Sequence, residues 1–197
     1  MADKILLNGE FWNPKEENLP CLITYAEKSG GSHFSIVMLA DLFNNGSKIL
    51  FFSAFPMARD NFLGHIKGGE DVSYVTKEND LKNDSKIIII ESGNQSLFLK
   101  ALRGLEDVKK RVVLVKNIEL FSSETIESCL KLDKVIVSGD VDLCSTNKKI
   151  MDKDFNTIVI FSNPKTTLPF AVPELEKYKG YIWSVNNKGI ITVQREN

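Results

Sequence analysis

The residues that come closest to a chemical motif in this chain lie between positions 22 and 35. An apolar run from Leu22 to Tyr25 leads into a turn of small and polar residues, and a long apolar stretch follows. The turn contains Ser29, Gly30, Gly31, Ser32 and His33. This order predicts a strand, a tight turn and a helix, which is the layout of loops that bind phosphate groups.

The chemistry of such a loop depends on the pattern G-x-x-x-x-G-K-[ST], whose lysine contacts phosphates and whose hydroxyl contacts magnesium. Aligned on Gly31, the chain has Ala26 for the first glycine, Ser32 for the lysine and His33 for the hydroxyl. Two interpretations stay open. The segment is a tight turn that needs glycine for positive φ, or Ser29 to His33 form a weak nucleotide or anion site from backbone amides.

Acidic partners of this loop would be expected directly after the other strands, because ligands bind beyond the carboxyl ends of parallel strands. Lys116 stands where a carboxylate that supports magnesium is expected, and a cation there opposes metal binding. Glu91 and Asp140 are the acidic candidates for a cofactor contact, and each is also an ordinary solvated or loop carboxylate. The sequence predicts no catalytic residue and no metal site. The only cofactor it suggests is a weakly bound nucleotide or phosphate.

Alternating strands and helices must position these residues. Continuous apolar, often β-branched runs are typical of strands covered on both faces of a parallel sheet. They occur at 21–26, 48–53, 86–90, 111–115, 134–138 and 157–161, with a weaker edge strand at 71–76. Helices are expected at 34–43, 57–66, 94–105 and 123–132, and a closing hairpin at 181–185 and 190–193.

This alternation with an antiparallel end predicts a three-layer α/β domain. The 197 residues fit a single domain over 1–197, with an N-terminal extension at 1–20 and the closing hairpin within 181–194. We find no repeat, low-complexity tract or linker.

Composition restricts the partners and the compartment. The formal net charge of −1 gives no bulk attraction to nucleic acid or to an anionic membrane. No apolar run approaches the roughly 18 residues that span a bilayer, and the first residues lack the layout of a secretory signal. Cys21, Cys129 and Cys144 have no metal or disulfide spacing and are interpreted as buried packing residues. We therefore expect a cytoplasmic protein without a membrane partner.

Two further classes of site are disfavoured. The first is a Cys–His or Ser–His catalytic pair. His33 and His65 are the only histidines, and His65 lies in a helical stretch without a G-x-S-x-G elbow nearby. A basic face for nucleic acid is less favoured than a solvated helix surface, because Glu106 and Asp107 interrupt it. That face would comprise Arg59, Lys67, Arg103, Lys109, Lys110 and Arg111.

The segment from Leu22 to Phe55 resembles the core of the RecA-like P-loop NTPase superfamily, closest to its KaiC and Elongator-accessory-subunit branch. Lys48 to Ser53 matches the second strand of that core. Glu27 to Phe34 is similar to the degenerate loop of the sixth Elongator subunit, which keeps the fold without the lysine. The resemblance implies a three-layer α/β/α RecA-like fold with a mainly parallel sheet. It also implies subunits that pack side by side.

After the strand at 48–53, Phe55 and Pro56 stand where a RecA-type ATPase would offer an acid that orients the attacking water. The missing loop lysine, magnesium ligand and catalytic acid indicate a non-catalytic subunit that acts through protein–protein assembly. Its partners would be copies of itself or paralogous RecA-like subunits. Whether the chain is an enzyme stays open, although these losses argue against it. The alternatives are a nucleotide-responsive switch with little hydrolysis and a nucleic-acid-binding RecA relative.

Overall fold

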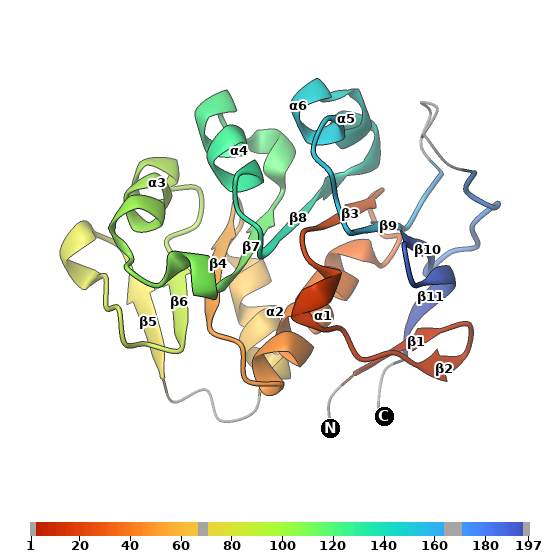
Figure 1. The fold of residues 1–197 in the computed structure, drawn as a ribbon, viewed down its shortest axis with the longest axis horizontal. Helices are drawn as coiled ribbons and strands as arrows, with labels where there is room; N and C mark the ends of the chain where they lie inside the picture. Colours follow the sequence, from red (N-terminus) through yellow and green to blue (C-terminus); the bar gives the residue numbers. More distant parts are fainter. Residues whose placement is uncertain (1–2, 67–70, 164–170, 195–197) are drawn as a thin grey trace.

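The computed structural model describes residues 3–66, 71–163 and 171–194, which form a single large sheet with helices on both faces (Figure 1). The sheet has 11 strands in the order β2-β1-β11-β10-β9-β3-β8-β7-β4-β6-β5. The alternation of apolar strands with helices predicted this arrangement, and the three-layer α/β fold class is confirmed.

Seven neighbouring strands, from β9 to β5 in the sheet order, run parallel to one another. They are β3 (Cys21–Tyr25), β4 (Ile49–Ser53), β5 (Val72–Val75), β6 (Ile87–Ile90), β7 (Val112–Lys116), β8 (Val135–Asp140) and β9 (Thr157–Ile160). Every residue of β3, β4, β6 and β7 is buried, as expected for strands covered on both faces. The weaker strand β5 lies at the edge of the sheet, also as expected.

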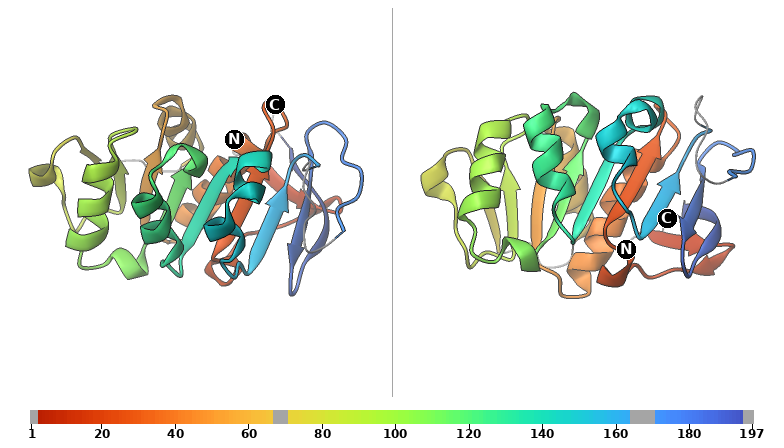
Figure 2. Two further views of the ribbon diagram at one scale, coloured as in Figure 1. Left: turned by 90° about the horizontal axis from the view of Figure 1, so that it is seen from above. Right: turned by 45° about the horizontal axis from the view of Figure 1, so that its top comes forward.

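The helices form two layers on opposite faces of the sheet (Figure 2). One layer contains α1 (Gly31–Asn44) and α2 (Met57–His65). The other contains α3 (Gln95–Gly104), α4 (Ser123–Leu130), α5 (Val141–Thr146) and α6 (Lys148–Met151). Each layer buries its own apolar cluster against the sheet, so the protein has two cores separated by the strands.

Helix α1 is the central element of the first core. Nine of its residues are buried, among them Phe34, Ile36 and Leu39. A helix that is apolar nearly all round must be enclosed on most sides, and α1 is enclosed by β3, β7, β8, β1 and α2. It begins at Gly31, three residues before the start expected at Phe34. The residues of the loop motif therefore form its first turn.

The antiparallel end of the sheet contains more strands than the sequence predicted. The closing hairpin is present as β10 (Lys179–Ser184) and β11 (Lys188–Gln194). The N-terminal segment, expected as an extension, instead contributes β1 (Lys4–Leu7) and β2 (Glu10–Phe11). Strand β1 pairs with β11 and buries Ile5 completely, which brings two strands from opposite ends of the chain side by side (Figure 1).

Helices α5 and α6 were also not predicted. Their sequences carry too few apolar residues for a helical period, and local caps fix them instead. The Asp140 carboxylate accepts hydrogen bonds from the amides of Asp142 and Leu143, and Asn147 caps α6 in the same way. Within the described ranges, no helix is both long and apolar enough to cross a membrane.

Candidate functional site

The loop between β3 and α1 lies at the carboxyl edge of the parallel strands, where ligands bind in folds of this kind. Gly30 has φ of +99°, a conformation that glycine adopts without strain. A Cβ on Gly31 would lie 2.5 Å from the Cβ of Tyr25, so only glycine fits where α1 starts against β3. Both glycines are thus explained by the turn. This explanation leaves the anion-binding interpretation open.

The side chains of the loop point to different surroundings. Ser32 is exposed, whereas the Ser29 hydroxyl is buried and has no hydrogen-bond partner among the described residues. His33 turns towards the N-terminal strand, and its Nε2 lies 2.6 Å from the Asp3 Oδ2. The structure therefore does not gather these side chains around one point, and any anion held here would rest mainly on the backbone amides of the first turn of α1.

A cleft of about 990 Å³ opens over this loop. Its lining combines Gly30 and Ser32 from the loop, His33 and His65 from α1 and α2, and Lys116 from the end of β7. Phe55, Met57 and Tyr178 also line it, and they are 53%, 74% and 56% exposed. We call these three exposed apolar residues the rim residues; the exposed polar residues Glu27, Lys28 and Asn61 line the same cleft.

Lys116 is the most unusual residue of this cleft, because it is only 2% exposed. Its Nζ donates hydrogen bonds to the carbonyl and hydroxyl oxygens of Ser32, both at 3.0 Å, and to the hydroxyl of Ser35 at 2.9 Å. It also lies 5.6 Å from the centre of the Tyr25 ring. The amine thus ties the end of β7 to the first turn of α1.

Burial lowers the pKa of Lys116 from its ordinary value of 10.5 to about 7, although the nearby charge of Glu119 partly opposes this shift. Burial conversely raises the pKa of Glu119. A lysine with this pKa changes its charge near neutral pH, so the electrostatics of the loop depend on pH.

Glu119 belongs to a second group of buried polar atoms beside Lys116. The Glu119 Oε2 and the hydroxyls of Tyr25 and Ser138 have no hydrogen-bond partner among the described residues. Burial, with a smaller contribution from the charge of Glu119, raises the pKa of Tyr25 to about 12. Gly139 makes room for this group, since a Cβ there would lie 2.1 Å from the Glu119 Oε2. Sequence reasoning missed Glu119, because it follows β7 by three residues and lies in a short 3-10 turn, Ile118–Leu120.

The two acidic residues selected from the sequence lie elsewhere. Glu91 follows β6, which is separated from β3 by the strands β8, β7 and β4, and it accepts a hydrogen bond from the Asn94 side chain. Asp140 ends β8 directly beside Tyr25, but its Oδ1 caps α5. Neither residue lines the cleft over the loop.

Two other sequence interpretations have clear outcomes. All three cysteines are free and buried, as expected for packing residues, and burial raises the pKa of each thiol. For Arg111, both the basic face and the favoured interpretation as a solvated helix surface are wrong. Its side chain is fully buried, with Nε 2.7 Å from Asp107 and a second hydrogen bond of 2.9 Å to the carbonyl of Asn83. Lys67, another residue of that face, lies outside the described residues.

Comparison with solved structures places this fold among those of P-loop NTPases. The genome packaging NTPase B204 of Sulfolobus turreted icosahedral virus 2, in complex with AMPPCP, has a TM-score of 0.55 at 15% identity. The alignment covers 90% of this chain and 96% of that one. The same NTPase in complex with sulfate has a TM-score of 0.57 at 11% identity, and the alignment covers 90% of this chain and 96% of that one.

The cytoplasmic domain of the type VII secretion ATPase EccC from Thermomonospora curvata gives a TM-score of 0.61 at 10% identity, over 100% of this chain and 26% of that one. The sequence matches no protein-family model and no curated protein. At these identities the likeness establishes the fold alone. The narrower resemblance to the KaiC and Elongator-accessory branch stays a prediction.

Proposed function

We propose that this chain is a non-catalytic member of the P-loop fold class that acts by assembling with other protein subunits. The observation that carries the proposal is the position of Lys116. Its amine reaches from the end of β7 to Ser32 and Ser35, which is where the resemblance implies a magnesium-binding carboxylate. Magnesium requires oxygen ligands, and a lysine amine supplies none.

The loop itself supports the same conclusion. Ser32 stands in place of the lysine that would contact phosphates, and His33 in place of the hydroxyl that would contact magnesium. Catalysis of phosphoryl transfer consists mainly of positioning the reactants and stabilising the charge on the phosphoryl oxygens, to which the loop lysine and the magnesium ion both contribute. The loss of several kcal/mol of this stabilisation lowers the rate by orders of magnitude.

The rim of the cleft is the surface that we assign to assembly. Phe55 and Met57 follow β4 and are largely exposed, and the exposed Tyr178 lies against Gly30 of the loop. Exposed apolar side chains that gather at one place are typical of interaction surfaces. We assign this surface to a second copy of the chain or to a paralogous P-loop-fold subunit.

Light scattering coupled to size exclusion tests the assembly. The wild-type chain should elute as an oligomer at high micromolar concentration, and the double variant Phe55→Ser, Met57→Ser should elute at the monomer mass. Leu143→Ser is the matched control, because Leu143 is 54% exposed but lies on α5, outside the cleft. A wild-type chain that is monomeric throughout would contradict the proposal.

A second candidate function, nucleotide binding without hydrolysis, is favoured by the cleft above Gly30 and Ser32. Helix N-termini bind anions readily, and a cleft of this volume is in the range of small-molecule sites.

Thermal melting with millimolar MgATP separates the two functions. A ligand that binds only the folded chain raises its melting temperature, so the primary proposal expects no change. A rise that the variant Ser32→Glu abolishes, while Ser96→Glu on α3 retains it, would establish nucleotide binding at the loop instead. Magnesium-dependent phosphate release by the pure chain would overturn the non-catalytic assignment. A salt-sensitive shift with single-stranded DNA would favour the nucleic-acid-binding alternative.

A further inference from the structure

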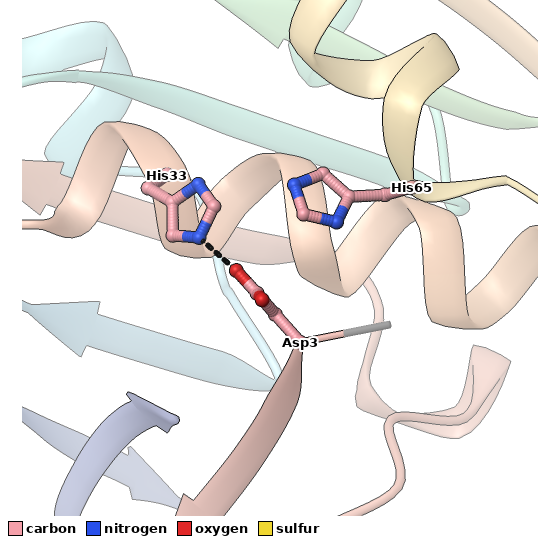
Figure 3. Close-up of side chains that lie close together, drawn as sticks. All are labelled: Asp3, His33 and His65. Carbon is pink, nitrogen blue, oxygen red and sulfur yellow. Dashed lines mark hydrogen bonds and ion pairs between the residues drawn. The ribbon is translucent and has the colours of Figure 1, made fainter. Parts of the chain in front are cut away.

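Three side chains with metal-binding atoms meet beside the first turn of α1 (Figure 3). Asp3 directly precedes β1, His33 lies in the first turn of α1, and His65 is the last residue of α2. One ligand atom from each residue lies within 4.8 Å of the other two. We propose that Asp3, His33 and His65 form a binding site for a divalent transition-metal ion, of which zinc fits best.

The ligand set suits this chemistry. Two imidazoles and one carboxylate are a common set for zinc with an open coordination position, and imidazole nitrogen favours zinc and its neighbours over magnesium or calcium. The chain has only two histidines, far apart in sequence, and both lie in this cluster. The rings of the two histidines lie side by side, with their centres 5.2 Å apart.

The distances require only small shifts. Ligand atoms at about 2.0–2.2 Å from a tetrahedral zinc lie roughly 3.4 Å from one another. The His33 Nε2 and the Asp3 Oδ2 are closer than this, at 2.6 Å, because they form a hydrogen bond. Zinc would replace the proton of that hydrogen bond, and the pair would open by less than about 1 Å. The other ligand atoms lie within 4.8 Å of one another, so their distances would close by up to about 1.4 Å.

The backbone around the site is held firmly. Helix α2 is anchored by Phe62, which is fully buried and stacks on Phe51 with ring centres 5.5 Å apart. Asp3 is positioned by the pairing of Lys4 with Gln194 between β1 and β11. Ligands that project from three anchored elements lose little conformational freedom on binding, which favours affinity.

The site is shielded on one side and open on the other. The side chains of Asp3 and His33 are 12% and 27% exposed. Both His33 and His65 line the cleft above the loop, so the fourth position of a bound zinc would face that cleft. Water or a small anion would complete the coordination there. The site is independent of the proposed assembly function, since it uses none of the rim residues.

Equilibrium binding of metal tests the proposal directly. The full chain, freed of any histidine tag, would be titrated with zinc at about pH 7.5 against a chromophoric chelator, because metal affinity depends on pH. A separate titration with cobalt would record visible d–d bands. We expect one equivalent to bind. Because Cys21, Cys129 and Cys144 are buried away from the site, the cobalt spectrum should lack thiolate charge-transfer bands.

Variants of the ligands make the result specific. His65→Ala and Asp3→Asn should each weaken zinc binding at least tenfold and remove the zinc-dependent rise in melting temperature. Asp60→Asn is the matched control, because this exposed carboxylate lies on α2 and pairs with Arg59. His65→Ala keeps the Asp3–His33 pair and should keep a wild-type circular dichroism spectrum. Binding that is absent in the wild type, or unchanged in both ligand variants, would overturn the proposal.

Discussion

Lys116 places an ionisable group where water cannot solvate its charge. Between its lowered pKa of about 7 and the ordinary value of 10.5, the unfolded chain binds a proton at this residue that the folded chain has released. The free energy of unfolding therefore rises with pH across this window, by up to about 1.4 kcal/mol per pH unit. Below pH 7 both states are protonated, so the contribution to the slope disappears.

The variant Lys116→Met should lack this dependence. Urea titrations at a series of pH values would measure the free energy of unfolding of both proteins. The value for the wild type minus that for the variant should increase with pH between the folded and unfolded pKa values of Lys116. Lys82→Met is a suitable control because Lys82 is exposed, and its difference from wild type should stay flat. A flat difference for Lys116→Met as well would mean that the amine keeps its proton on folding.

For single residues, the sequence could predict a role that depends only on the neighbouring positions in the chain. A tight turn at Gly30 and Gly31 is one of the two interpretations that their neighbours in the sequence support, and the structure shows the positive φ at Gly30. The cluster of Asp3, His33 and His65 could not be predicted, because β1 must pair with β11 before Asp3 reaches α1. Nothing in the spacing of these residues signals that pairing.

The junction of β3 and α1 gives an element-scale prediction. Gly31→Ala should lower the free energy of unfolding by about 1–3 kcal/mol, because its new methyl group would overlap the Tyr25 side chain. Gly64→Ala is the informative counterpart. Gly64 lies in α2, and no heavy atom of the described residues comes within 4 Å of the place its Cβ would take. Alanine there should therefore stabilise the protein by up to about 1 kcal/mol.

Urea unfolding curves would measure both changes. If Gly31→Ala and Gly64→Ala changed the free energy of unfolding equally, the methyl group at position 31 would not overlap the Tyr25 side chain, which would contradict the prediction.

The predictability of the elements depends on what defines each one. Most parallel strands and α1 were predictable because each is a continuous apolar run, and α3 and α4 because their apolar residues recur at helical spacing. Strands β1 and β2 and helices α5 and α6 were not, since pairing with β11 and capping by Asp140 and Asn147 define them.

At the scale of the molecule, the N-terminal strand should contribute strongly to stability. Ile5 is fully buried in the core beneath α1, so Ile5→Ala should cost about 2–5 kcal/mol in free energy of unfolding. Phe11→Ala is the control, because Phe11 on β2 is 63% exposed and should change stability little. A loss below about 0.5 kcal/mol at Ile5, which is the size of an ordinary surface effect, would contradict the placement of β1 in the sheet.

The three-layer architecture was predictable because it follows from the alternation of elements along the chain. The pairing of β1 with β11 at one end of the sheet was not predictable, since it depends on contacts such as that between Lys4 and Gln194. The likeness to a viral packaging NTPase and a secretion ATPase supports the architecture. The proposed assembly would depend instead on surface residues such as Phe55 and Met57, which the fold does not dictate.

The pairing of β1 with β11 has a consequence for synthesis. Strand β1 is synthesised before β11, so the two strands cannot pair until Lys188–Gln194 has also emerged from the ribosome. Before that moment the chain lacks the pairing that places the carboxylate of Asp3 beside His33. The cluster of Asp3, His33 and His65, which we propose as a metal site, is therefore completed only after β11 has been synthesised.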